Sequence, residues 1–208
     1  MTTESNNTQA SATSASNPAD TALKHAIPET TILQGKRCIL RPYKVSDAED
    51  MVEPNNDPEV IRYFRTGFPI PYTLDAAHWW VAHCIPGPTL SFAILSLEGE
   101  YAGSITLKAP TGCVDYAGTR ELGYLLARKF WGRGFMTEAT QLVARWAFAT
   151  LPDLLRIEAS VLHENEASRR VLQKAGFVEE GTRRLAAVKN GKPYDEVIFG
   201  LLRTDLEA

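Results

Sequence analysis

The sequence has few cysteines and no group of cysteines spaced to hold a metal. Cys38, Cys84 and Cys113 lie far apart and form neither a CxxC pair nor a zinc pattern. Three scattered cysteines favour buried reduced thiols over a disulfide framework, and reduced thiols are typical of a reducing compartment. We therefore expect a cytoplasmic protein without a metal site.

An excess of positive charge is also missing. Lys and Arg total 22 against 25 Asp and Glu, which gives a formal net charge of −3 and a pI near 5.8. Proteins that bind nucleic acid usually carry a clear excess of Lys and Arg, so we expect no nucleic-acid partner. No stretch approaches the roughly 18 apolar residues of a membrane-spanning helix, and we expect no membrane partner.

The first 22 residues contain little that could form a core. Eighteen of them are Ser, Thr, Asn, Gln or Ala, and they include no apolar segment and no arginine. A secretory signal needs an apolar segment and a mitochondrial presequence is rich in arginine, so neither is expected. Such a polar composition is typical of disorder. The sequence predicts a disordered tail at 1–29 and one folded domain at 30–208.

What the folded part does contain is a regular alternation of strand and helix patterns, with no internal repeat. Strands are expected at 37–43, 89–97, 101–108, 119–127, 154–162, 177–185 and 195–202. Helices are expected at 46–54, 58–65 and 74–84, from Thr137 until Pro152, and at 164–176, with Ser46, Asp57 and Thr73 as N-caps. A mixed sheet with helices, of α+β or α/β type, follows from this order.

Two glycines stand between the strand at 119–127 and the helix that follows it. Gly132 and Gly134 allow a tight turn whose backbone N–H groups face outward, and the positive end of the helix dipole adds to them. Such a turn binds a phosphate or pyrophosphate, with Arg133 adding charge at its edge. The pattern fits neither a dinucleotide-binding fingerprint nor a P-loop. Taken alone, the glycine pair also suits an ordinary strand-to-helix turn.

Two longer stretches extend this pattern. "ELGYLLARKFWGRGFMTEA" (121–139) and "NEASRRVLQKAGFVEEG" (165–181) resemble the GCN5-related N-acetyltransferases (GNAT), most closely the branch with the ribosomal-protein N-terminal alanine and serine acetyltransferases. The resemblance runs from about residue 36 to residue 203. It implies an α+β, three-layer fold with a central mixed, mostly antiparallel twisted sheet of about seven strands. It also implies that the sheet is splayed between the strands at 119–127 and 154–162.

The resemblance further implies acetyl-CoA as cosubstrate. In this superfamily the strand–turn–helix unit binds acetyl-CoA through Gln/Arg-x-x-Gly-x-Gly/Ala, where this chain has Lys129 in place of Gln or Arg. A second motif, Asn-x-x-Ala/Ser, falls on Asn165 and Ser168. The implied cofactor-binding residues are Leu125, Leu126, Ala127, Lys129, Gly132, Arg133, Gly134, Phe135, Met136, Thr137, Asn165 and Ser168.

The catalytic residues depart from the most common pattern of the superfamily. Many members protonate the leaving thiolate with a tyrosine seven residues after the motif's asparagine, and that position is Leu172 here. The branch resembled has a serine nearby, which implies Ser168 as the proton donor. The glutamate base of some relatives is replaced by Ala186 and Ala187, so Glu121 is the remaining candidate. A chain of water molecules could replace it, because an N-terminal α-amine titrates near pH 8.

The resemblance places the amine acceptor between the early helices and the last hairpin. Asp195 and Glu196 could hold a cationic acceptor there. Trp79 and Trp80 are expected either in the core, which we favour, or in the lining of the acceptor cleft. The residues expected to bind the acceptor are Phe68, Tyr72 and Tyr194.

Three functions follow from the sequence, with the first favoured. The protein is an N-acetyltransferase for a peptide or protein N-terminal α-amine. Alternatively it acetylates a small-molecule amine such as a polyamine, an antibiotic or a metabolite. The third possibility is a non-catalytic acyl-CoA-binding module, because the common tyrosine and glutamate are missing. A monomer and a homodimer are both compatible with the sequence.

Overall fold

The computed structural model describes residues 27–85, 89–109 and 114–206. The predicted tail at 1–29 therefore lies almost wholly outside the described residues. Among the described residues, none of the helices combines the length and apolar character needed to cross a bilayer.

One mixed sheet forms the centre of the molecule. Its order is β1-β2-β3-β4-β5-β6-β8-β7, and every neighbouring pair is antiparallel except β5 and β6, which are parallel. The strands are β1 Leu33–Gln34, β2 Cys38–Pro42, β3 Leu90–Ser96, β4 Tyr101–Lys108, β5 Thr119–Leu126, β6 Arg156–Leu162, β7 Val178–Lys189 and β8 Lys192–Leu202. The predicted α+β class is confirmed, and the eighth strand is the two-residue β1.

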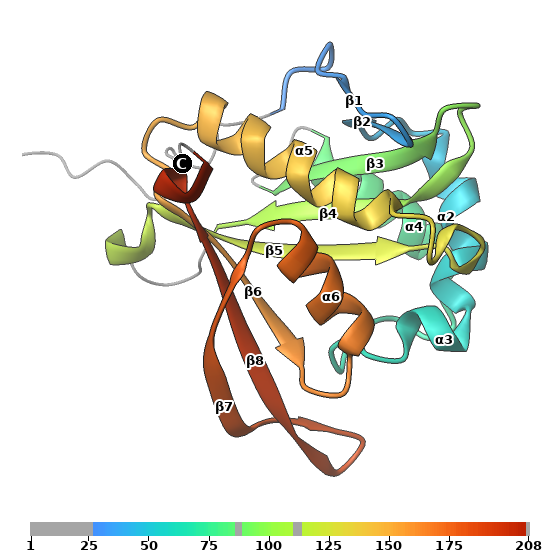
Figure 1. Cartoon of the computed structure of the whole chain (residues 1–208). Helices are drawn as coiled ribbons and strands as arrows, with labels where there is room; N and C mark the ends of the chain where they lie inside the picture. The colour runs from blue at the N-terminus through green and yellow to red at the C-terminus, as the bar shows by residue number, and fades with distance from the viewer. Residues whose placement is uncertain (1–26, 86–88, 110–113, 207–208) are drawn as a thin grey trace, which may run out of the picture.

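Helices cover both faces of this sheet. They are α2 Asp47–Asn56, α3 Pro58–Ile61, α4 Leu74–Cys84, α5 Phe135–Thr150 and α6 Glu166–Lys174, with 3-10 turns at η2 Val114–Tyr116, η3 Arg128–Phe130 and η4 Arg203–Leu206. Figure 1 shows α5 and α6 over the near face and α2 and α4 behind the sheet. The result is three layers, as the sequence predicts.

The central strand β3 shows how the two faces are filled. All its residues are buried because helices cover the sheet on both sides. Phe92 and Ile94 belong to the core under α5, where the Phe92 ring meets Trp146 edge-on at 5.0 Å. Ala93 points the other way, into a smaller core with Met51 of α2 and Val81 of α4. The strand alternation therefore builds two cores on one sheet.

The three predicted N-cap residues all stand at N-cap positions, and two of them make the side-chain bond of a cap. Thr73 Oγ1 accepts a hydrogen bond from Ala76 N at 3.2 Å, and Asp57 Oδ1 accepts one from Glu59 N at 2.9 Å. Ser46 also stands at the predicted N-cap position of α2, but its side chain makes no cap bond. Asp47 takes the local role instead: it accepts from Lys44 N at 2.8 Å and pairs with Arg41.

The last hairpin is longer than its sequence pattern indicates. The predicted strands at 177–185 and 195–202 extend to Val178–Lys189 and Lys192–Leu202. The register shifts between Arg183 and Ala187, where Leu185 takes a φ of 52° and donates its N–H to Asp195 Oδ1 at 2.7 Å. This bulge breaks the two-residue alternation that marks a strand in a sequence, although pairing continues beyond it.

Candidate active site

The site begins where β5 and β6 separate. Their parallel pairing covers only Thr119 to Glu121 of β5, opposite Arg156 to Glu158 of β6, whereas β6 stays paired with β8 along its whole length. Figure 1 shows the two strands diverging beyond this point. The predicted splay is therefore confirmed, and it opens a gap in the middle of the sheet.

The register of β5 decides which of its backbone groups face that gap. Ala127 N donates to Ala102 O at 2.8 Å, and a Cβ added to Gly103 would lie 2.2 Å from Leu125 O. The backbone groups of Leu125 and Ala127 are thus turned toward β4. Because direction alternates along a strand, the groups of Tyr124 and Leu126 face the gap. The expectation that Leu125 and Ala127 offer backbone groups to a ligand in the gap is wrong.

Trp131 occupies part of this edge. Its indole Nε1 donates to Leu126 O at 2.8 Å, which uses that carbonyl. The backbone groups of Tyr124 and the N–H of Leu126 therefore face the gap at positions where β6 no longer pairs with β5.

The turn after β5 has the backbone shape that the sequence predicts. Gly132 and Gly134 have φ angles of 70° and 80°, in the left-handed region that favours glycine. Gly134 is the N-cap of α5 and has no side chain to bond the first turn. The N–H groups of Phe135, Met136 and Thr137 consequently lack helix partners and point out of the helix end. The helix starts at Phe135, two residues earlier than predicted.

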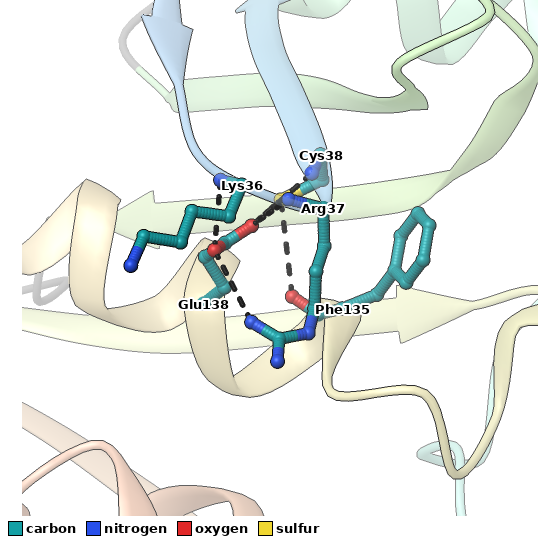
Figure 2. A network of polar contacts seen from close by, with 5 residues as sticks. All are labelled: Lys36, Arg37, Cys38, Phe135 and Glu138. Carbon is teal, nitrogen blue, oxygen red and sulfur yellow. Dashed lines mark hydrogen bonds and ion pairs between the residues drawn. The ribbon is translucent and has the colours of Figure 1, made fainter.

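Glu138 fixes this helix end to the start of β2, as Figure 2 shows. Its carboxylate accepts hydrogen bonds from the backbone N–H groups of Lys36 at 2.9 Å, Arg37 at 2.7 Å and Cys38 at 3.1 Å. Burial acts to raise the pKa of Glu138, but the three N–H donors outweigh it, so the pKa lies below its ordinary value. The first turn of α5 is held in place by a charged carboxylate.

Arg37 and Cys38 also contact Glu138, the residue that joins the start of α5 to the start of β2. The Arg37 guanidinium lies 3.6 Å from Glu138 and so close to Gly134 that a Cβ there would meet Arg37 Nε at 3.2 Å. The φ angle of Gly134 favours glycine, and an added Cβ would also require the Arg37 side chain to shift slightly. Cys38 is a free, buried cysteine, and burial raises the pKa of its thiol to about 12. That thiol stays neutral, which suits packing and not nucleophilic chemistry.

A cavity of about 1570 Å³ runs from this helix end through the gap. Ligand pockets for one drug-sized molecule are typically about 300–1,000 Å³, so this cavity has room for two ligands. The predicted cofactor residues that line it are Leu125, Leu126, Gly132, Gly134, Phe135, Met136, Thr137, Asn165 and Ser168. Among the described residues, no group of three or more His, Cys, Asp or Glu side chains is placed to hold a metal.

Three predicted cofactor residues do not line the cavity. Ala127 is turned toward β4, as its bond to Ala102 requires. Lys129 forms an ion pair with Glu100, and Arg133 lies over the rings of Phe130 and Phe135 at about 5.5 Å. These contacts keep both cations on the outer side of the turn. The positive charges that the sequence predicts at the edge of the glycine turn, on Lys129 and Arg133, therefore already have partners within the protein.

Hydroxyl groups gather on the far side of the gap, where α6 begins. Asn165 is the N-cap of α6 and accepts from Ser168 N at 3.2 Å. The Tyr124 hydroxyl crosses from β5 and donates to Ser168 O at 3.3 Å. Burial raises the pKa of Tyr124 to about 12, so it keeps its proton at neutral pH. Leu172, where many GNAT enzymes carry tyrosine, is fully buried in the core.

Glu121 lies at the point where the strands separate. It lines the cavity, forms an ion pair with Arg65, and sits opposite Lys108 in the β4–β5 register. Its carboxylate is therefore near the gap but is already neutralised by an arginine.

The other end of the cavity is rich in aromatic side chains. Phe68 and Tyr72 stack with ring centroids 5.3 Å apart, and both line the cavity. Both are residues expected from the sequence to bind the acceptor. Trp79 and Trp80 line the cavity too, and Trp79 is 66% exposed. Of the two positions expected for this pair, the favoured core position is therefore wrong for Trp79, and the lining position is the one observed. Tyr194 does not line the cavity; Lys192 lies 4.7 Å above its ring.

Sequence reasoning missed several residues of this site. Tyr124, Trp131, Arg65 and Lys189 line the cavity but stand at positions that neither motif specifies. Only Tyr124 had a usable signal, because it sits one residue before the predicted cofactor positions on the same strand.

The family model described as the acetyltransferase (GNAT) domain matches residues 37–178, which is more than half of the chain. This chain belongs to the GNAT acetyltransferase family. An uncharacterized N-acetyltransferase of Bacillus licheniformis is 31% identical over 177 residues, covering 83% of this chain and 97% of that protein. Two Bacillus subtilis proteins match over shorter stretches: an uncharacterized N-acetyltransferase is 39% identical over 40% of this chain and 46% of that protein, and a probable N-acetyltransferase is 44% identical over 43% of this chain and 49% of that protein.

Solved structures agree with this assignment. An acetyltransferase described as putative, from T. thermophilus, has a TM-score of 0.70 and 30% identity, covering 88% of this chain and 94% of that one. Mycobacterium smegmatis RimJ in complex with CoA-disulfide has a TM-score of 0.70 and 26% identity, covering 82% and 84%. The family and its named members indicate N-acetyltransferase activity for this chain.

Proposed function

We propose that this GNAT protein uses acetyl-CoA to acetylate the N-terminal α-amine of a peptide or protein. One observation carries the proposal. A continuous cavity joins the α5 turn, with its outward N–H groups, to the aromatic end through the gap between β5 and β6. Two substrates entering from opposite ends would meet at the gap.

The residues at the α5 end fit the phosphates of CoA. Gly132 and Gly134 leave backbone N–H groups at the positive end of a 16-residue helix, and the N-cap position brings no side chain to bond them. The backbone edge of Tyr124 would pair with the amides of the pantetheine arm as a further strand. When bound there, acetyl-CoA supplies an activated thioester, and the chain holds that thioester in position beside the gap.

The hydroxyls of Ser168 and Tyr124 are the proposed source of the proton for the leaving thiolate. Both residues line the cavity at the start of α6, where the Tyr124 hydroxyl donates to the backbone carbonyl of Ser168. Glu121 remains a candidate for accepting a proton from the amine, although Arg65 holds its carboxylate. A water molecule beside Glu121 would serve equally for an α-amine whose pKa is near 8.

Two observations support the choice of a peptide acceptor: the name of one relative and the shape of the aromatic end of the cavity. A Bacillus subtilis protein described as a putative ribosomal N-acetyltransferase is 37% identical over 114 residues. A fungal enzyme named FsC-acetyl coenzyme A-N(2)-transacetylase, from Aspergillus fumigatus, is 31% identical over 139 residues, and it represents the small-molecule alternative. The long aromatic end of the cavity suits a chain that enters by its N-terminus.

A thiol-release assay separates the three functions. The purified chain is mixed with acetyl-CoA and a panel of peptides, polyamines and free amino acids, and free CoA is measured. We expect release with peptides that have a free N-terminus and none with the same peptides blocked by acetylation. Faster release with polyamines would favour the small-molecule function. Tight binding of acetyl-CoA without release for any amine would favour the non-catalytic module.

A further inference from the structure

The acceptor end of the cavity has more cationic than anionic side chains. Its cations come from the segment after α3, from the end of β4 and from β7, which lie far apart in the sequence. The cations are Arg62, Arg65, Lys108, Arg183 and Lys189, and the carboxylates are Glu59, Glu121 and Glu196. Five cations face three carboxylates at this end.

Each of the three carboxylates is already paired with an arginine. Glu59 lies 3.6 Å from Arg62, and Glu121 pairs with Arg65. Glu196, which the sequence offered as a partner for a cationic acceptor, is 3.5 Å from Arg183. Asp195, the other such residue, accepts the N–H of Leu185 and does not line the cavity. The expectation of a cationic acceptor at these two residues therefore has no support in the geometry.

Of the five cations, the two lysines have no carboxylate partner in the part of the chain that the structure describes. Lys108 ends β4 opposite Glu121, but Glu121 is bound to Arg65. Lys189 is half-buried, and its ammonium donates to the carbonyl of Arg62. Burial lowers the pKa of Lys189, which is the effect expected for a cation that lacks a nearby negative charge.

This charge pattern acts on an acceptor in two ways. It repels polyamines, whose further ammonium groups would meet unpaired lysines, and it attracts negative groups attached to the reacting amine. It also lowers the pKa of an amine held there, because neighbouring cations disfavour the ammonium form. A neutral amine is the reactive form, so the same cations reduce the demand on a general base.

Resting on the proposed function, we propose that the acceptor is a peptide with acidic residues immediately after its N-terminal amine. The cations lie on three segments and do not converge on one point, so they suit negative charges spread along a chain. The aromatic side chains of Phe68, Tyr72 and Trp79 would contact the apolar parts of that chain.

Matched peptides test this directly. Peptides begin with the same alanine and continue with acidic, neutral amide or basic residues, and thiol release gives kcat/KM for each. We expect the acidic peptide to exceed the neutral one by about tenfold, and the basic peptide to be poorer still. The preference should shrink as salt rises from low to about 0.5 M, because exposed charges are screened. Equal rates for all three, or a preference for spermidine, would overturn the proposal.

Free aspartate and glutamate form a further arm. They carry the same negative groups without a peptide chain, and the proposal expects them to be poor acceptors. If they match the acidic peptide, the acceptor is a small amino acid and the peptide claim is wrong.

A charge-reversal pair locates the effect. Lys189→Glu should lower the ratio of kcat/KM for the acidic peptide to kcat/KM for the neutral peptide by about tenfold. Lys192→Glu, on the same hairpin but outside the cavity, makes an equal change in net charge. If both variants lose the same activity, the preference is a long-range effect and not a contact in this cavity.

Binding separates this inference from the proposed function. Quenching of tryptophan fluorescence, with Trp79 and Trp80 in the cavity, reports peptide binding to the CoA complex without any turnover. Tighter binding of the acidic peptide with no thiol release would retain the charge preference and reject the acetyltransferase. Release without charge preference would retain the enzyme and reject the charge preference.

Discussion

The two ends of the cavity are built in different ways. At the α5 end, the groups offered to a ligand are backbone N–H groups, fixed by Gly134, by Glu138 and by the sheet register. At the acceptor end they are side chains from α3, α4, β4 and β7. A rigid backbone site suits a substrate that is the same for every family member, whereas side chains can change without disturbing the fold. The variants below test this division.

The largest expected effect lies between the two ends, at Tyr124. Tyr124→Phe should lower kcat by about 100-fold without changing the affinity for CoA, because it removes only the proposed proton donor. Ser168→Ala should lower kcat by about tenfold. Tyr116→Phe, an exposed tyrosine, serves as the control. Single-turnover kinetics measures the rate of acetyl transfer. An unchanged rate for Tyr124→Phe would mean that water, and not Tyr124, protonates the leaving thiolate.

The next effect concerns stability at the α5 end. Glu138→Gln should cost about 2 kcal/mol at pH 7, because a charged acceptor of three N–H bonds is replaced by a neutral one. Thermal unfolding should shift by roughly 6 °C. Glu166→Gln, which loses only an exposed pair with Arg170, should shift by much less.

The same variant gives a pH dependence with a defined sign. The folded-state pKa of Glu138 is lowered, so its contribution is present above the unfolded glutamate pKa of about 4.3. It is lost as pH falls through the lower folded-state value. The difference between wild type and Glu138→Gln should therefore shrink below about pH 4. A difference that stays constant down to acid unfolding would mean that the carboxylate charge is not what holds the helix end.

At the acceptor end, Trp79→Ala should act on one substrate only. The exposed ring lines the cavity and stacks on His83 at 5.3 Å, so its loss should raise KM for the peptide by about fivefold. Calorimetry should give an unchanged CoA affinity. A parallel loss of both affinities would show that the two ends are coupled and would break the comparison.

The smallest effect is expected at Lys129. Lys129→Ala removes a cation that already pairs with Glu100 on the outer side of the turn. CoA affinity should change by less than about twofold. A larger loss of CoA affinity would mean that Lys129 contacts the phosphates of CoA, as the motif implies.

The two ends of the cavity also differ in how well the sequence predicted them. The glycine turn and the start of α6 are recorded in neighbouring residues, so a local motif was enough to predict them, whereas the splay was predicted only from the family resemblance. The direction of Leu125 and Tyr124 depends on the β4 register, and the anchor at Glu138 depends on residues about 100 positions away. The acceptor end was predicted least well. Its exposed Trp79 looks like a core residue in sequence, and its lysines carry no spacing signal.

A calorimetric titration of CoA tests the central claim, that backbone N–H groups at the start of α5 hold the cosubstrate. Gly134→Val strains a φ of 80° and crowds Arg37, whereas Gly99→Val strains a φ of 90° in open space in the turn between β3 and β4. The account predicts that Gly134→Val weakens CoA binding at least about tenfold and Gly99→Val leaves it unchanged. Equal affinities for wild type and Gly134→Val, in a protein that remains folded, would contradict it.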